Sequence, residues 1–216
     1  NKENGLRANQ VQAYDDFNRK LIELYAAYEQ QCQREGAVDF AELLLRCYEL
    51  LSRNEMLREH YQARFQHIVV DEFQDTNKLQ YDWLRLLAGR DNAVFAVGDD
   101  DQSIYAFRGA RVGNMYDFER DYQVKNLIRL EQNYRSQGNI LDAANALIGN
   151  NQGRLGKNLW TAEGAGEPLK VYEAFADLDE AQFIVDEVKQ LQREGIHLND
   201  IAVLYRSNAQ SRVIEH

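Results

Sequence analysis

Residues 67–75 of this chain read His67-Ile68-Val69-Val70-Asp71-Glu72-Phe73-Gln74-Asp75, and this stretch decides the fold. A β-branched run that ends in two adjacent carboxylates is typical of a buried parallel strand that delivers acids to the carboxyl edge of a sheet. Open α/β sheets bind their ligands at that edge. One carboxylate can hold a Mg²⁺ ion while its neighbour orients or deprotonates a water, as nucleoside triphosphate hydrolysis requires. Strand ends of this kind also arise by chance, so the rest of the chain must decide.

Predicted strands and helices alternate along the rest of the chain. Apolar runs predict further strands at residues 93–99, 127–130, 169–172 and 201–205. Helical periodicity and capping residues predict helices at residues 9–34, from 39 onward with Asp39 as the N-cap, and at 55–65, 77–88, 136–148 and 179–193. This alternation indicates α/β architecture with parallel sheets.

Composition describes a folded chain with an uneven charge distribution. The 216 residues are 44% apolar and contain no run long enough to span a membrane and no secretion signal, so we expect a cytoplasmic protein without a membrane partner. The net charge of −10 argues against nucleic acid as a partner. Residues 67–101, however, carry eight acids against three bases, and residues 102–136 carry six bases against four acids. This pattern suits a metal–phosphate site beside a polyanion track, although solvated helix faces explain it equally well.

A second group of polar and aromatic residues, 98–109, follows the predicted strand at 93–99. Because it follows a strand, its polar side chains should emerge at the same sheet edge as Asp71 and Glu72. Gln102 can hydrogen-bond a terminal phosphate. Tyr105 and Phe107 can stack on bases, and Arg108 can grip a phosphate of single-stranded nucleic acid. A turn whose aromatic side chains pack inward is an equally good interpretation.

A third group, residues 130–136, again follows a predicted strand. An arginine such as Arg135, aimed at a γ-phosphate, would stabilise the charge that develops during phosphoryl transfer. Tyr134 could lie flat on an adenine. The alternative is a surface arginine in a salt bridge, as most arginines are.

In this order and spacing, the three stretches resemble motifs II, III and IV of the UvrD/Rep/PcrA family of superfamily 1A DNA helicases. They read Val-Asp-Glu-Phe-Gln-Asp-Thr-Asn, Val-Gly-Asp-Asp-Asp-Gln-Ser-Ile-Tyr-x-Phe-Arg-Gly-Ala and Leu-Glu-Gln-Asn-Tyr-Arg-Ser. The flanking residues 153–161 and 204–212 look most like the UvrD branch of the family. The resemblance covers essentially the whole chain.

The resemblance implies a role in ATP hydrolysis for each matching residue. Asp71 would be the Mg²⁺ ligand and Glu72 the general base. Gln102 would couple the state of the γ-phosphate to DNA. Tyr134 would lie against the adenine ring, and Arg135 would be the arginine finger.

The resemblance also implies contacts with DNA. Tyr105, Phe107 and Arg108 would meet single-stranded DNA. The family often has Trp where this chain has Phe107, and Phe offers a smaller face for stacking. Phe40 and Asn208 resemble further DNA contacts.

For the whole chain, the resemblance implies parts of two RecA-like P-loop NTPase domains, with parallel sheets flanked by helices, preceded by a helical segment. Residues 1–50 would be the helical tail of a 1B-like domain, 51–133 the C-terminal part of domain 1A, and 134–216 the N-terminal part of domain 2A. The parent would be a 3′–5′ helicase that uses ATP and Mg²⁺ on single-stranded and duplex DNA in repair and replication, with repair proteins as partners. The alternatives are a helicase–nuclease subunit of the same superfamily and a non-catalytic DNA-binding or interaction module.

The sequence lacks the Gly-x-x-x-x-Gly-Lys-[Ser/Thr] loop that cradles phosphates in such enzymes. Its Gly156-Lys157 pair is followed by Asn158 and does not fit this pattern. We therefore expect the chain to be an internal fragment of a helicase of several hundred residues. We also expect the fragment alone to hydrolyse ATP negligibly, because the β- and γ-phosphates would lack their main cradle.

Overall fold

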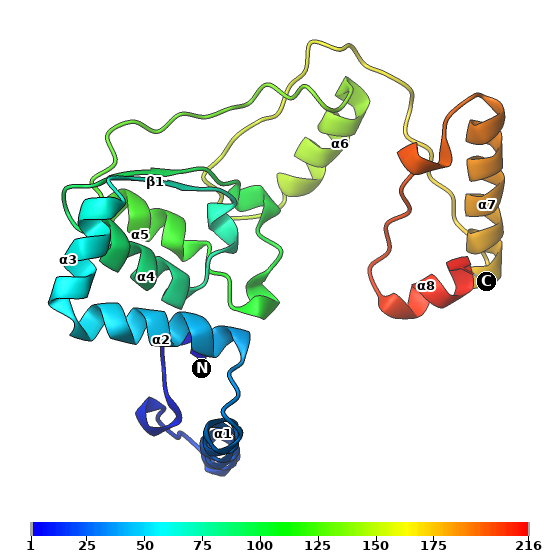
Figure 1. The fold of residues 1–216 in the computed structure, drawn as a ribbon. Coiled ribbons are helices and arrows are strands. Elements are labelled where there is room, and N and C mark those ends of the chain that lie inside the picture. Colours follow the sequence, from blue (N-terminus) through cyan, green and yellow to red (C-terminus); the bar gives the residue numbers. More distant parts are fainter. Residues whose placement is uncertain (1, 216) are drawn as a thin grey trace. The chain divides into compact units, whose positions relative to one another are not determined.

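The computed structural model describes residues 2–215, which divide into two compact units (Figure 1). Unit 1 runs up to residue 132 and includes residues 144–160, whereas unit 2 consists of residues 133–143 and the chain from 161 onward. The helices and strands are α1 Asp16–Glu35, α2 Phe40–Arg53, α3 Glu55–Arg64, β1 His67–Val70, α4 Lys78–Ala88, β2 Ala93–Ala96, α5 Gly113–Asp121, α6 Gly138–Ile148, α7 Asp177–Arg193 and α8 Asn208–Glu215. No helix among the described residues is long and apolar enough to cross a membrane.

The sheet of unit 1 consists of β1 and β2, which pair in parallel with His67 opposite Ala93 and Val70 opposite Ala96. Helix α4 forms the crossover between them. The predicted strand–helix–strand unit is therefore confirmed. The prediction that β1 is a buried strand is wrong, because Val69 on its outer face is 74% exposed. Only one face of this two-stranded sheet is covered.

Helices α4 and α5 cover the inner face of the sheet (Figure 1). The buried centre of this packing consists of Phe73, Tyr81 and Leu84. Partly buried side chains surround it: Ile68, Val70, Val94, Ala96, Met115, Phe118 and Tyr122. The Phe73 ring lies edge-on to Phe118, with centroids 5.2 Å apart. Because Phe73 directly follows Asp71 and Glu72, this core anchors the chain just beyond the two carboxylates.

The helical segment before β1 follows the predicted capping signals only in part. Asp39 caps α2 as predicted, because its side chain accepts a hydrogen bond of 2.7 Å from the Glu42 amide. Helix α1 begins at Asp16 rather than at residue 9, because Asp15 caps it by accepting the Asn18 amide at 2.6 Å. No residue of α1 is buried, and its aromatic residue Phe17 is 72% exposed.

The strands predicted at residues 127–130, 169–172 and 201–205 are not formed among the described residues. Near the first of these segments, Gln132 makes one isolated parallel bridge to Trp160. Ile128 is 73% exposed. An apolar run becomes a strand only when a neighbouring strand satisfies its backbone groups, and β1 and β2 pair only with each other. The predicted α/β class is confirmed, with one small parallel sheet and many helices.

Unit 2 contains α7 and α8, which pack on one another. The predicted helix boundaries shift slightly, since α7 begins at Asp177 and α6 begins at Gly138. The first residues of α6 are tied to a later loop, where Asn139 donates from its side chain to the Gly166 carbonyl at 3.0 Å. The rings of Tyr172 and Phe183 stack at 4.2 Å, which holds the segment before α7 against that helix.

Candidate functional site

Asp71 and Glu72 lie at the carboxyl end of β1, as predicted, and both are exposed. The backbone pairing continues beyond the strands, because the Val97 amide donates to the Val70 carbonyl at 2.8 Å and the Phe73 amide donates to Val97 at 2.9 Å. Glu72 has a left-handed backbone, with φ 50° and ψ 44°, which is uncommon for a residue other than glycine. The sharp turn places the two carboxylates beside the residues that follow β2.

The turn after β2, residues 98–102, is held together by Asp99. Its side chain accepts the Asp101 amide at 3.0 Å and the Gln102 side-chain amide at 2.7 Å. Gln102, the residue predicted to sense the γ-phosphate, thus lies in a turn that follows directly from the strand paired with β1. The structure therefore brings Asp71, Glu72 and Gln102 to the same sheet edge.

Gln74 joins these two strand ends, and the sequence analysis gave it no role. Its side chain is buried, with 1% exposed. The Gln74 amide nitrogen donates to Glu72 Oε2 at 2.7 Å, and the amide oxygen accepts the Asp99 backbone amide at 2.9 Å. A polar residue directly after the buried Phe73 was the only signal in the sequence. This signal does not show that Gln74 would bind Glu72 after one strand and Asp99 after the other.

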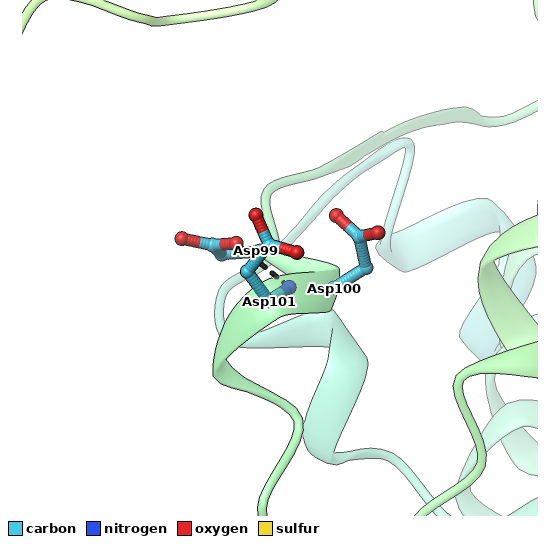
Figure 2. A group of neighbouring side chains, drawn as sticks. All are labelled: Asp99, Asp100 and Asp101. Atoms are coloured by element: carbon cyan, nitrogen blue, oxygen red, sulfur yellow. Dashed lines mark hydrogen bonds between the residues drawn. The ribbon is translucent and has the colours of Figure 1, made fainter. Parts of the chain in front are cut away.

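The three acids Asp99, Asp100 and Asp101 lie close together in this turn, with carboxylate oxygens within 4.8 Å of one another (Figure 2). Basic side chains of residues 154–157 already engage two of them. Arg154 binds Asp101 through two hydrogen bonds of 2.6 Å, and Lys157 pairs with Asp99. These pairs fit an ion-paired contact between two loops rather than a metal site.

Two further observations agree with an ion-paired contact between these loops. One is a backbone hydrogen bond, and the other is the charge state of Asp99. The Leu155 backbone amide donates to Asp100 at 2.7 Å. Burial favours the neutral form of Asp99, but hydrogen bonds from Lys157 and Gln102 outweigh burial and hold its pKa below the ordinary value. Lys157 of the Gly156-Lys157 pair therefore engages a carboxylate.

Tyr105, Phe107 and Arg108 form one cluster on the surface of unit 1. The Tyr105 and Phe107 ring centroids are 5.9 Å apart, and the Arg108 guanidinium lies 5.0 Å from the first and 5.4 Å from the second. Phe107 is 78% exposed. Of the two interpretations of this stretch, inward packing is wrong for Phe107, whose ring faces solvent.

The other candidate residues belong to different elements. Phe40 is the first residue of α2 in unit 1 and is 92% exposed. Tyr134 and Arg135 lie in unit 2, in a turn where Asn133 Oδ1 accepts the Arg135 amide at 2.9 Å. Asn208, also in unit 2, begins α8. Tyr134 is 78% exposed, so its ring is open to a ligand.

Comparisons with known proteins cover almost the entire chain. The model of the UvrD/REP helicase N-terminal domain matches residues 1–123, and that of the UvrD-like helicase C-terminal domain matches residues 128–216.

Several relatives are named as DNA helicases. DNA helicase II of Haemophilus influenzae is 53% identical over 99% of this chain, and that of Escherichia coli is 54% identical over the same share. ATP-dependent DNA helicase PcrA of Staphylococcus aureus is 47% identical over 95% of it. The chain spans only 28–30% of the length of these relatives. Because family models match both of its halves, the chain belongs to the UvrD/REP helicase family.

Proposed function

We propose that this chain is part of an ATP-driven DNA helicase that moves 3′ to 5′ and unwinds duplex DNA in repair and replication. The observation that carries the proposal is the convergence of Asp71, Glu72 and Gln102 at one sheet edge, together with the surface cluster of Tyr105, Phe107 and Arg108 in the same unit. One group has the chemistry for nucleotide hydrolysis and the other has the chemistry for gripping a single strand. The names of the relatives, DNA helicase II and ATP-dependent DNA helicase PcrA, support the same function.

Asp71 is the residue that would hold Mg²⁺. Its carboxylate is exposed, and only Oδ1 is engaged among the described residues, by the Glu72 amide at 2.9 Å. A carboxylate with a free oxygen beside a phosphate site fits the preference of Mg²⁺ for one or two carboxylates together with substrate phosphates. The bound ion would neutralise charge on the phosphates.

Glu72 would be the general base. Gln74 engages its Oε2, which leaves Oε1 to accept a proton from the attacking water. Gln102 would contact the γ-phosphate and transmit its presence through the turn to Tyr105 and beyond. Tyr134 would stack on the adenine, and Arg135 would stabilise charge on the transferred phosphoryl group.

Single-stranded DNA would bind the cluster of Tyr105, Phe107 and Arg108, with bases stacked on the rings and a phosphate on the guanidinium. Phe40 and Asn208 would add contacts from α2 and α8. Residues 1–50, 51–133 and 134–216 would then be parts of domains 1B, 1A and 2A, with repair proteins as partners of the whole.

The test is DNA-stimulated ATP hydrolysis by the full-length protein that carries this segment. We expect Glu72→Gln to lower kcat by about 10²- to 10⁴-fold, as loss of a general base does, while binding of a nucleotide analogue and of single-stranded DNA persists. Glu59→Gln, which changes an exposed carboxylate on α3, is the matched control and should keep full activity. Full turnover by Glu72→Gln would contradict the proposal.

The 216-residue chain alone provides a second measurement. We expect it to show no ATP turnover above that of its own Glu72→Gln variant, because its sequence contains no phosphate-cradling loop. Turnover that depends on Glu72 in the isolated chain would contradict this expectation while still supporting the role of Glu72.

A further inference from the structure

The buried Gln74 side chain hydrogen-bonds to both strand ends of the candidate site. Its two hydrogen bonds run in opposite directions, one to Glu72 and one from the Asp99 backbone. The Glu72 carboxylate, the Gln74 amide, Asp99 and the Gln102 amide thereby form a continuous chain of hydrogen bonds. This chain joins the residue that would act as base to the residue that would contact the γ-phosphate.

The backbone around Gln74 is shaped to keep this amide in place. A Cβ atom at Gly98 would lie 2.9 Å from Gln74 Oε1 and 3.3 Å from the Gln74 backbone nitrogen, so only glycine fits without a shift. On the other side, Phe73 is anchored in the core, with 2% exposed. A side chain fixed in this way has little freedom to release either partner, and buried polar groups that lose a partner are costly.

We propose that Gln74 is a positioning residue, which holds the Glu72 carboxylate in place for proton abstraction and links its position to the turn that carries Gln102. The inference rests on the proposed function, because it assigns Gln74 a task only if Glu72 acts as base. It adds a residue that touches neither nucleotide nor DNA. Movement of the turn at residues 98–102 would shift the Glu72 carboxylate through the Gln74 side-chain amide.

The test replaces Gln74 with residues of similar size in the full-length protein. Gln74→Glu keeps an oxygen that can accept the Asp99 amide but removes the donor to Glu72. Gln74→Met removes both hydrogen bonds and adds no charge. For both variants we expect kcat of the DNA-stimulated ATPase to fall by about 10- to 100-fold, with KM for ATP changed by less than about threefold, as expected for a misplaced catalytic group.

The split between kcat and KM separates positioning from simple loss of stability, because a destabilised protein would lose nucleotide and DNA affinity together with kcat. Gln31→Glu is the matched control, because Gln31 also donates its amide to a glutamate, Glu35, at 2.6 Å on the exposed surface of α1. It should leave both kcat and KM unchanged.

Three outcomes decide the inference. A kcat-selective loss, with KM for ATP changed by less than about threefold, supports it. Unchanged kcat in both Gln74 variants overturns it, and so does a parallel fall of kcat, nucleotide affinity, DNA affinity and melting temperature, which would mark a purely structural role. If Gln74→Glu does not fold, the KM-against-kcat behaviour of Gln74→Met decides in the same way. The Glu72→Gln variant shows whether only the inference about Gln74 fails or the proposed function fails too. Full activity of Glu72→Gln would contradict the proposed function itself.

Discussion

Glu42 is a single carboxylate that stays charged while only 5% exposed. Three basic side chains donate to it: Arg7 at 2.8 Å, Arg46 at 2.7 Å and Lys2 at 3.0 Å. Burial alone would raise the pKa of Glu42, but these hydrogen bonds outweigh it and lower the pKa from the ordinary 4.5 to about 2. The charge of Glu42 therefore fastens the N-terminal residues to α2.

This depressed pKa predicts how stability depends on pH. A folded-state pKa below the unfolded one stabilises the protein above the unfolded pKa, and the stabilisation is lost as the pH falls towards the folded pKa. We expect Glu42→Gln to lower the free energy of unfolding at neutral pH by on the order of 3 kcal/mol. The difference from the parent chain should shrink between about pH 4.5 and 2.

Urea unfolding followed by circular dichroism at a series of pH values measures this difference. Glu23→Gln is the control, because Glu23 pairs with Lys20 at the exposed surface of α1 and such pairs contribute little. Equal pH dependence in the Glu42→Gln variant and the parent chain would show that Glu42 is not the group that titrates.

At the scale of helices and loops, the turn at residues 99–101 contacts the loop at residues 154–157. The turn lies in the region that matches the N-terminal family model, and the loop lies in the region that matches the C-terminal one. The contact includes the Arg154–Asp101 pair, a bidentate contact with side chains 19% and 12% exposed. A partly buried bidentate pair holds geometry better than a surface pair does. The contact should therefore fix the 154–157 loop against the end of β2.

Removing one partner of this pair should free the loop. We expect Asp101→Asn to lower the local stability of residues 153–158 by about 1–3 kcal/mol, since it leaves Arg154 without its charged partner. Hydrogen exchange should show faster exchange of the Leu155 amide, which donates to the neighbouring Asp100. Asp117→Asn is the control, because Asp117 pairs with the exposed Arg120 on one helix. Unchanged protection of Leu155 in Asp101→Asn would show that the ion pair does not hold the loop.

The elements also show which structure could be predicted from the sequence. The cap at Asp39, the crossover helix α4 and the carboxylates after β1 depend on residues a few positions apart, and these predictions were correct. The strands at 127–130, 169–172 and 201–205 depend on a partner strand elsewhere, which no local pattern identifies. The role of Gln74 was missed for the same reason, because its second partner, Asp99, is 25 residues away.

At the scale of the whole molecule, the net charge of −10 opposes the approach of DNA, so any grip on a single strand must come from local contacts. The cluster of Tyr105, Phe107 and Arg108 supplies two aromatic faces but one guanidinium. Binding through such a cluster should depend more on stacking than on counterion release. The salt dependence of binding can therefore distinguish the aromatic from the electrostatic contribution to DNA affinity.

Titration of a fluorescent single-stranded oligonucleotide at several salt concentrations tests this balance. The Tyr105→Ala, Phe107→Ala double variant should weaken binding by about 1–3 kcal/mol for each base that loses its stacking partner, with little change in the salt slope. Arg108→Gln should instead reduce that slope by about one. Tyr14→Ala is the control, because Tyr14 is an aromatic residue that is 85% exposed but lies outside the cluster. If Tyr14→Ala weakens binding as much as the double variant does, the strand is held by exposed aromatic surface in general and the cluster is not the DNA site.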